Sequence, residues 1–399
     1  MLDHNNIYDL NTPLSVQELT PMDLYFYRPG TYTIQFLYKY NYQIDRFRLE
    51  RAVSNLLKTY PLLGSRITPR GNSVFLEPFC RGISIKESRI NSKNLPEVSD
   101  DSFFDPVKNL PSEPLIKIKL NHVDDQTYLG LSFSHILGDG QSLVLFMKAL
   151  ACSYKGDLLP VINFDRRAVS DLKRSLDINP RSLFVNTGYC YPRPPNPKHS
   201  VEFFEYIDLN HVESLKSYCL ERKNIKLSKN VIIMSLLFKK YYEMTSKNPE
   251  GKYILRCPVD YRQRHTGIPN NYFGNAVTDA FIELSPEKIP SLSVEDIAVL
   301  MKSAIERIDK DRVENSLGAL DSYRIKKGIG AFENLSCPGF LFSNFTRLPF
   351  QEFDFGQGGP VDFRHCSMNP RLAVILKKGK GIGVKVKLPL NRSNKNGRF

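Results

Sequence analysis

The sequence predicts an α/β protein. Segments in which apolar and polar side chains alternate with a period of two, typical of strands, interleave along the chain with amphipathic segments of helical period. The chain has 399 residues, the length of two domains of ordinary size. The sharpest change of composition lies at 191–199, where four prolines favour an extended, semi-rigid connector. We therefore predict an N-terminal domain over 1–190, a linker over 191–200 and a C-terminal domain over 201–399.

The first half is expected to open with a strand and a helix. Aromatic and polar side chains alternate over 34–43, which predicts a strand, and apolar residues at helical spacing over 47–58 predict a helix. Pro61 ends that helix and begins an extended stretch. A later helix follows Gly140 and stops at Gly156. The remaining strands of this half are expected at 73–78, 114–122 and 126–135.

The second half repeats the mixture of strands and helices. A strand over 201–208 precedes two helices, over 210–223 and 228–245, and apolar residues 231–238 form the buried body of the second helix. The elements expected after them are a strand at 253–259, a helix at 294–309, and strands at 339–345, 372–377 and 382–388.

Composition narrows the class of protein. Apolar residues make up 41% and charged residues 24%, as in soluble globular proteins. The formal charge of +13 favours anionic partners, although a merely soluble surface explains it equally well. The positive residues are scattered and form no recognisable nucleic-acid motif, so we expect no nucleic-acid partner. The longest apolar run, 231–238, is too short to cross a bilayer, and the polar N-terminus does not resemble a signal peptide.

The cysteines indicate a reducing compartment. They are odd in number, lie far apart and form no CxxC pair, which argues against a disulfide framework or a zinc site. We therefore expect a cytoplasmic protein without a metal, whose Asn-x-Ser/Thr sites carry no sugar. The cysteines are Cys80, Cys152, Cys190, Cys219, Cys257, Cys337 and Cys366, and the three sites begin at Asn334, Asn344 and Asn391.

One histidine stands out as a candidate catalytic base. In the segment 129–140, LGLSFSHILGDG, the period-two alternation is typical of a half-buried strand and places the His135 ring on its apolar face, just before a helix. A proton-transfer residue in such a position suits general base catalysis. The alternative is a satisfied structural histidine, with Asp139 serving only as the N-cap of the following helix.

Several motifs appear in a fixed order along the chain. His135 to Gly140 has the pattern His-x-x-x-Asp-Gly, and 354–358 reads Asp-Phe-Gly-Gln-Gly. With these two signatures the chain resembles the BAHD acyltransferases, which transfer acyl groups from coenzyme A thioesters. The resemblance covers most of 15–390. Its other segments are LTPMD at 19–23, YPLLGSR at 60–66, PVDYR at 258–262, YFGN at 272–275 and SNFTRLP at 343–349.

The resemblance implies a chloramphenicol-acetyltransferase type of fold. Two similarly built domains would enclose a solvent channel, with His135 at its centre. Two departures from the family pattern stand out. Gln357 replaces the tryptophan of the second signature, and the chain is shorter than most members and has a basic tail.

His135 is the candidate general base for direct acyl transfer, without an acyl-enzyme. Ser132 and Ser134 stay open as covalent nucleophiles. A helix that starts at residue 139 turns the Asp139 carboxylate away from the imidazole. The resemblance implies instead a structural ion pair between Asp139 and Arg262, for which arginine is well suited.

Gln357 is a candidate oxyanion donor, because its side-chain amide carries two N–H groups. The alternative is a loop with a purely structural function, in which Gly356, Gly358 and Gly359 give a tight turn and residue 357 faces solvent. Asp354 and Gly356 are expected to be structural residues at the active site.

The resemblance also suggests binding residues. Ser228 and Lys229, at the start of a helix, match the region that contacts coenzyme A, and a helix N-terminus attracts anions. The alternative is an ordinary cap and a solvated lysine. Arg347 is a candidate for binding an acidic acceptor, with a salt bridge at the rim of the core as the alternative.

The predicted function is acyl transfer from acyl-CoA, as co-substrate, to a small-molecule alcohol or amine, with the alcohol favoured. We expect no permanently bound cofactor and a monomer. One alternative is an inactive binding protein of the same fold, suggested by Gln357. Another is a carrier-protein-dependent condensation domain, although such domains usually have a second histidine where this chain has Ser134.

Overall fold

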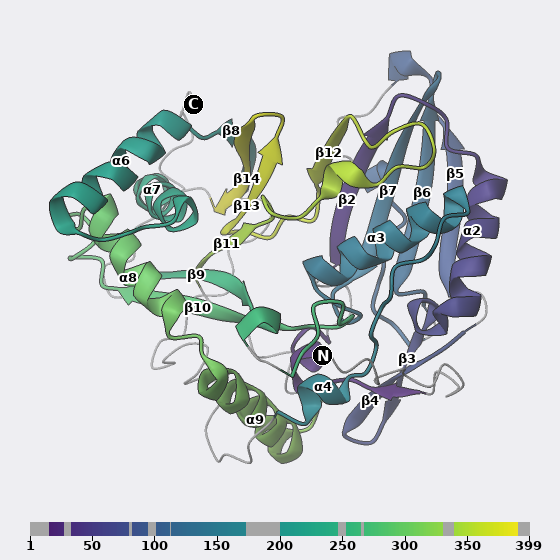
Figure 1. Cartoon of the computed structure of the whole chain (residues 1–399), viewed down its shortest axis with the longest axis horizontal. Coiled ribbons are helices and arrows are strands. Elements are labelled where there is room, and N and C mark those ends of the chain that lie inside the picture. The colour runs from purple at the N-terminus through teal and green to yellow at the C-terminus, as the bar shows by residue number, and fades with distance from the viewer. Residues whose placement is uncertain are drawn as a thin grey trace, which may run out of the picture.

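Two large sheets, each with helices packed on it, form the two halves of the molecule, and a small third sheet lies beside the N-terminal half (Figure 1). Within the described ranges, no helix combines the length and apolar character needed to cross a bilayer. The residues that this computed structural model describes are 16–27, 33–79, 82–94, 101–111, 113–172, 200–245, 253–264, 267–329 and 339–389.

The sheet of the N-terminal half has five strands in the order β12-β2-β7-β6-β5. Helix α3 packs on it through an aromatic contact between Phe133 and Phe146, and a second helix, α2, packs against α3 (Figure 1). The small sheet has the order β1-β4-β3. The bounds are β1 Gln17–Glu18, α1 Pro21–Tyr25, β2 Thr33–Tyr40, α2 Arg46–Thr59, β3 Arg66–Arg70, β4 Ser73–Glu77, β5 Ile83–Arg89, β6 Ile116–Val123, β7 Gln126–Ser134, α3 Gly140–Lys155 and α4 Arg167–Ser170.

The sheet of the C-terminal half has six strands in the order β10-β9-β11-β13-β14-β8. Helix α7 packs on one face of it, where Tyr241 stacks on Phe342, and α8 packs beside α7 (Figure 1). The bounds are β8 Ser200–Tyr206, α6 Leu209–Lys223, α7 Lys229–Met244, β9 Tyr253–Asp260, β10 Val277–Leu284, α8 Val294–Glu306, α9 Lys310–Lys327, β11 Phe340–Asn344, β12 Asp362–His365, β13 Leu372–Lys378 and β14 Gly381–Pro389.

Strand β12 belongs to the C-terminal half of the sequence but to the N-terminal sheet. It pairs antiparallel with β2, so that Asp362 lies opposite Lys39 and His365 opposite Phe36. As the first strand of its sheet, β12 forms an edge. The segment that leads from β11 to β12 therefore ties the two halves together (Figure 1).

Most predicted elements are confirmed, with ends that move by a few residues. The helix predicted over 294–309 ends at Glu306, because Asp309 caps a separate helix, α9, by accepting from the N–H of Arg312. Of the predicted linker 191–200, residues 191–199 lie outside the described residues, and Ser200 opens β8. The domain boundaries stay a prediction. The unpredicted elements are β1, α1, β3, β5, α4, β10, α9 and β12.

The prediction of a half-buried strand before His135 was wrong, because both faces of β7 are buried. Phe133 packs toward α3 on one face, and Phe103 covers the other, with its ring 5.6 Å from that of Tyr128. Gly130 permits this close approach, since a Cβ there would lie 2.1 Å from the Phe103 carbonyl oxygen. Polar residues at alternate positions of β7 are thus buried and hydrogen-bonded rather than solvated.

Candidate active site

His135 lies in the turn that follows β7, one residue beyond the strand. Its ring stacks on Phe26, with the centroids 3.7 Å apart and the planes 14° from parallel. Burial lowers the pKa of His135, and the nearby Asp139 carboxylate only partly opposes that effect. The imidazole is therefore neutral near pH 7, which is the state that a general base requires.

Asn275 fixes which nitrogen of His135 carries the proton. The Asn275 Nδ2 donates to Asp23 Oδ1 and to the backbone oxygen of His135, both at 2.8 Å, so its Oδ1 is the atom that faces the imidazole. His135 Nδ1 lies 3.0 Å from this oxygen. An amide oxygen only accepts, so Nδ1 carries the hydrogen and Nε2 keeps a free lone pair. In the sequence, Asn275 stood out only as the last residue of the motif segment 272–275, and no function was predicted for it.

Asp23 and Arg166 form a second layer behind Asn275. Arg166 Nε donates to Asp23 Oδ2 at 3.0 Å, and Arg166 Nη2 donates to the Leu137 oxygen at 2.9 Å. Both side chains of this ion pair are almost fully buried. The pair thus holds Asn275 on one side and the turn after His135 on the other. Sequence reasoning missed Arg166, because Arg166 and Arg167 together have the pattern of an exposed turn.

Asp139 does not hydrogen-bond to His135 but binds Arg262 through two hydrogen bonds. Nη1 lies 2.9 Å from Oδ2 and Nη2 lies 3.0 Å from Oδ1. The same carboxylate accepts from the backbone N–H groups of Ser142 and Ala276, each at 3.0 Å. Burial raises the pKa of Asp139, but Arg262 and these hydrogen bonds outweigh it and hold the pKa below its ordinary value. The expected ion pair is therefore present, and Asp139 is also the N-cap of α3.

The two serines of β7 are engaged elsewhere. The Ser134 hydroxyl donates to Asn109 Oδ1 at 2.6 Å, and Ser132 Oγ accepts from the Gln35 side chain at 3.4 Å. Both are fully buried. A serine nucleophile must pass its proton to a base. The Ser134 proton points to an amide oxygen, so this geometry disfavours an acyl-serine.

The comparisons with known proteins identify the family of this chain. A family model described as "Transferase family" matches residues 9–394. The chain belongs to this family, the BAHD acyltransferases. The prediction of an acyl-CoA-dependent acyltransferase is thereby confirmed at the level of the family.

Similar BAHD proteins match this chain over most of its length. It is 22% identical to a hydroxycinnamoyl-CoA:5-hydroxyanthranilate N-hydroxycinnamoyltransferase of Avena sativa, over 89% of this chain and 85% of that protein. It is also 22% identical to a shikimate O-hydroxycinnamoyltransferase of Nicotiana tabacum, with the same coverage. The structure of F. graminearum TRI101 with ethyl coenzyme A superimposes with a TM-score of 0.77 at 15% identity, covering 94% of this chain and 95% of that one. The predicted fold is thus confirmed.

The hypothesis that Gln357 donates to the oxyanion is wrong, because the structure places Gln357 far from His135. The loop is held by Tyr42, whose hydroxyl donates to the Gly358 oxygen at 2.7 Å. Tyr42 lies just beyond one end of β2, where Tyr40 pairs with Thr127. His135 lies at the opposite end of β2, where Thr33 pairs with Ser134. Seven residues of strand span about 23 Å.

Helix α3 gives the same separation independently. Its N-terminus lies beside the turn of His135, and Tyr154 in its last turn contacts Phe355 of the loop, with ring centroids 5.3 Å apart. Fourteen helical residues span about 21 Å. Gln357 is exposed to solvent in this BAHD member, as the alternative interpretation held.

Asp354 and Gly356 build the turn of this loop. Asp354 Oδ1 accepts from the N–H groups of Gly356 and Gly358, both at 2.7 Å. These two glycines have φ angles of +104° and +99°, which residues other than glycine rarely adopt. Asp354 and Gly356 therefore shape a turn at the far end of the sheet and not at the reacting group.

The predicted binding residues lie at the surface. Ser228 is the N-cap of α7 and accepts from the Val231 N–H at 3.4 Å, while Lys229 is exposed and paired with Glu213. Arg347 is exposed. The residues beside Arg347 lie close to the start of α3, since a Cβ on Gly140 would meet Phe345 at 3.0 Å and Leu348 at 3.2 Å. Arg347 is thus on the His135 side of the molecule.

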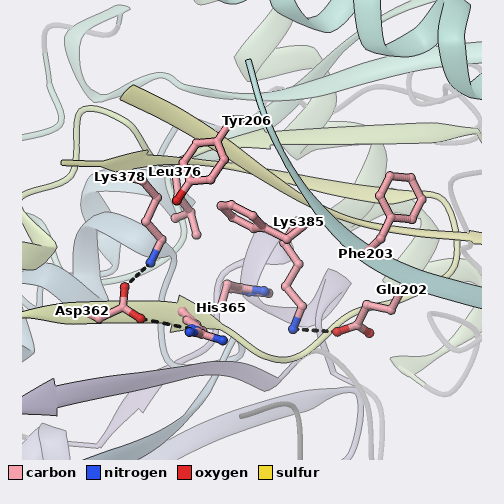
Figure 2. A pocket seen from close by; sticks show the side chains of 10 residues that line it. Glu202, Phe203, Tyr206, Asp362, His365, Leu376, Lys378 and Lys385 are labelled. Atoms are coloured by element: carbon pink, nitrogen blue, oxygen red, sulfur yellow. Dashed lines mark hydrogen bonds and ion pairs between the residues drawn. The ribbon is translucent and has the colours of Figure 1, made fainter. Parts of the chain in front are cut away.

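A cavity of about 770 Å³ lies between the two halves. Edge strand β12 forms one wall, and β8, β13 and β14 form the other (Figure 2). A volume of this size suits a small organic molecule. Its lining residues are Glu202, Phe203, Phe204, Tyr206, Asp362, Arg364, His365, Leu376, Lys378 and Lys385.

Proposed function

We propose that the protein transfers an acyl group from an acyl-CoA thioester to a hydroxyl group of a small-molecule acceptor, with Nε2 of His135 as the general base. The observation that carries the proposal is the hydrogen bond that His135 Nδ1–H donates to Asn275 Oδ1, because it leaves Nε2 unprotonated. An amine acceptor would undergo the same chemistry. The relatives bear names of both kinds, O- and N-hydroxycinnamoyltransferases.

The reaction is a direct transfer in two steps. The acceptor O–H gives its proton to Nε2 of His135 as its oxygen bonds to the thioester carbonyl carbon. The tetrahedral intermediate then expels the thiolate of coenzyme A, which takes the proton back from the imidazolium. Binding of both substrates beside the same histidine further accelerates the reaction, because the reacting groups are held close together.

The start of α7 is the proposed contact for the acyl donor. The N-terminus of α7 offers backbone N–H groups beside Ser228, which suits a phosphate of acyl-CoA. Structures similar in fold hold coenzyme A. Lys229 would first have to release Glu213 to bind such an anion. A cytoplasmic location and a monomeric state stay predictions.

The two competing functions are not favoured. The inactive binding protein was suggested by Gln357. By the strand and helix lengths above, that residue is about 20 Å from His135, so the side chain at residue 357 does not contact the reacting atoms. In the condensation-domain alternative a second histidine would stand at residue 134. Here Ser134 is buried and bound to Asn109.

Thiol release tests the proposed function. The purified protein is incubated with acetyl-, malonyl- and aroyl-CoA and with panels of alcohols and amines. We expect acceptor-dependent release of coenzyme A, and a loss of about 10²–10⁴-fold in the His135→Gln variant. His211→Gln is the matched control, since His211 lies exposed on α6. The proposal fails if His135→Gln releases thiol as fast as the wild type.

A further inference from the structure

The imidazole of His135 lies flat against the ring of Phe26. The ring centroids are 3.7 Å apart and the planes differ by 14°, so the face of one ring covers the face of the other. Phe26 is 9% exposed, which keeps water away from most of this contact. The face of a phenyl ring carries partial negative charge, because of its quadrupole. The contact therefore acts differently on the neutral and on the protonated imidazole.

A short helix, α1, presents Phe26 to the base. Thr20 Oγ1 accepts from the Asp23 N–H at 3.1 Å, and the Thr20 N–H donates to Asp23 Oδ2 at 3.0 Å. This capping box starts the helix, and Pro21 stands in its first turn. Phe26 ends the helix, with its N–H donating to the Asp23 oxygen at 3.0 Å. Tyr25 packs edge-on against Phe26, with centroids 5.1 Å apart, and further restricts its ring.

The same helix holds His135 by its edge and by its face. Asp23 Oδ1 accepts from Asn275 Nδ2 at 2.8 Å, and the Asn275 oxygen accepts from His135 Nδ1. Three residues after Asp23, Phe26 covers the face of the imidazole. The hydrogen bond fixes the direction of Nδ1, and the stack fixes the plane of the ring. Rotation of the imidazole about its Cβ–Cγ bond would break both contacts, so Phe26 helps to aim Nε2.

The carboxylates that act on His135 are already paired with arginines. Burial lowers the pKa of His135 and outweighs the Asp139 and Asp23 carboxylates, which act in the opposite direction. Asp139 binds Arg262, and Asp23 binds Arg166, within nearly fully buried ion pairs. Each negative charge is thus balanced by a guanidinium. Neither carboxylate is left to neutralise a positive charge on His135.

His365 is a further titratable side chain whose charge interacts with that of His135. Burial, Lys385 and His135 together lower the pKa of His365 to about 3, so His365 is neutral at physiological pH and does not repel a protonated His135. Protonation of Nε2 therefore creates a cation that faces an aromatic ring in a largely dry site. A cation within about 6 Å of a ring centroid is attracted to the ring face, most strongly where water is excluded.

We propose that Phe26 is a positioning residue of the acyl transfer, and that its ring face stabilises the imidazolium that forms when Nε2 of His135 takes the proton of the acceptor. The inference rests on the proposed function, because it needs His135 to act as the general base. The proton then passes to the thiolate of coenzyme A, and Phe26 is chemically unchanged. The stack offsets part of the effect of burial, which stays the larger effect and keeps the pKa of His135 below its ordinary value.

Fluorinated phenylalanines at residue 26 separate charge stabilisation from packing. Each fluorine weakens the negative face of the ring and scarcely changes its size. The full-length chain is therefore made with phenylalanine, 4-fluoro-, 3,5-difluoro- and 3,4,5-trifluorophenylalanine at residue 26. NMR titration without substrates measures the pKa of His135, whose signal is assigned by its loss in His135→Gln. We expect this pKa to fall with each fluorine, by about one pH unit over the series. An unchanged pKa would refute the stabilisation of the imidazolium.

Phe103 is the matched control for this series. It is fully buried, and its ring packs near Tyr128 on the face of β7 that is turned away from α3. The same fluorinated residues at 103 should leave the pKa of His135 unchanged. Equal falls in the two series would overturn the assignment, because they would reflect fluorine in the core and not the stack on His135.

Single-turnover thiol release measures what the stack contributes to the reaction. At about pH 8 the base is neutral in every variant, and we expect the rate to fall about three- to tenfold along the series at residue 26. A rate that stays level while the pKa falls would overturn the function of Phe26 in acyl transfer. Failure of the proposed function itself would show separately, as thiol release that His135→Gln does not reduce. Thermal unfolding of each variant checks that the fold is intact.

Discussion

His135 and Asn275 come from opposite halves of the chain, yet the imidazole Nδ1 lies 3.0 Å from the amide oxygen. Asn275 also donates to the His135 backbone oxygen, so it holds both the ring and the main chain of the same residue. Asp23 orients Asn275 in turn and is itself paired with buried Arg166. The general base is thus positioned by residues that the two signatures do not contain.

Removing the Asn275 amide should impair catalysis without removing the base. We expect Asn275→Leu to lower kcat about 10²-fold, since a misaligned base loses roughly that much. The hydrogen bond that His135 Nδ1–H donates to Asn275 raises the pKa of His135, so the acidic limb of the pH–rate profile should also move to lower pH in the variant. Steady-state kinetics over pH measures both effects. Asn91→Leu, at an exposed position, is the control, and an unshifted acidic limb would contradict a positioning function.

The pH dependence of the wild type follows from the burial of His135. Its pKa is lowered, so the neutral base persists below the ordinary histidine value of about 6.5. We expect kcat/KM to stay level as pH falls to about 6.5 and to decline only below it, as Nε2 takes up a proton. The profile is measured by thiol release with saturating acyl-CoA. A midpoint above 6.5 on the acidic side would show that the imidazolium is stabilised, contrary to this geometry.

Breaking the buried pair of Asp139 and Arg262 should destabilise the protein. Asp139→Asn leaves a buried guanidinium without its counter-ion, which costs about 3–5 kcal/mol in free energy of unfolding. The folded-state pKa of Asp139 is depressed, so its stabilisation is present above the unfolded value of about 3.9 and is lost as pH falls through the folded value. The difference between wild type and variant should therefore shrink in acid.

Urea unfolding at several pH values measures this difference. Glu50→Gln is the control for an ion pair, because it breaks the exposed pair of Glu50 with Arg46, whose contribution to stability should be small. A variant Asp139→Asn that is as stable as the control would refute the importance of the buried pair.

Substitution of Gln357 should leave the reaction almost untouched. The loop lies at the end of β2 opposite His135, so we expect Gln357→Ala to retain kcat within threefold of the wild type. Asp354→Ala is the comparison, since it removes the acceptor for two backbone N–H groups and should lower the thermal midpoint. A loss of more than tenfold in Gln357→Ala with an unchanged midpoint would restore the oxyanion hypothesis.

Local sequence patterns determined most of the secondary structure of this protein and its family. Periodicity and capping act over a few residues, so they place α2, α3 and most strands, and they mark Asp139 as a helix cap. The spacing of His135 and Asp139 and the order of the motifs lead to the family and to the pair with Arg262. These features depend on neighbours in the sequence or on a matching order of segments, and both are visible without coordinates.

Only the tertiary structure decided the rest, because contacts between distant segments depend on how whole surfaces pack. Asn275, Asp23 and Arg166 meet at His135 from three separate segments. The pairing of β12 with β2 carries His365 into the cavity, and the length of β2 carries Gln357 away from the base. Burial on both faces of β7 is likewise a property of what packs on the strand, which no alternation within the strand encodes.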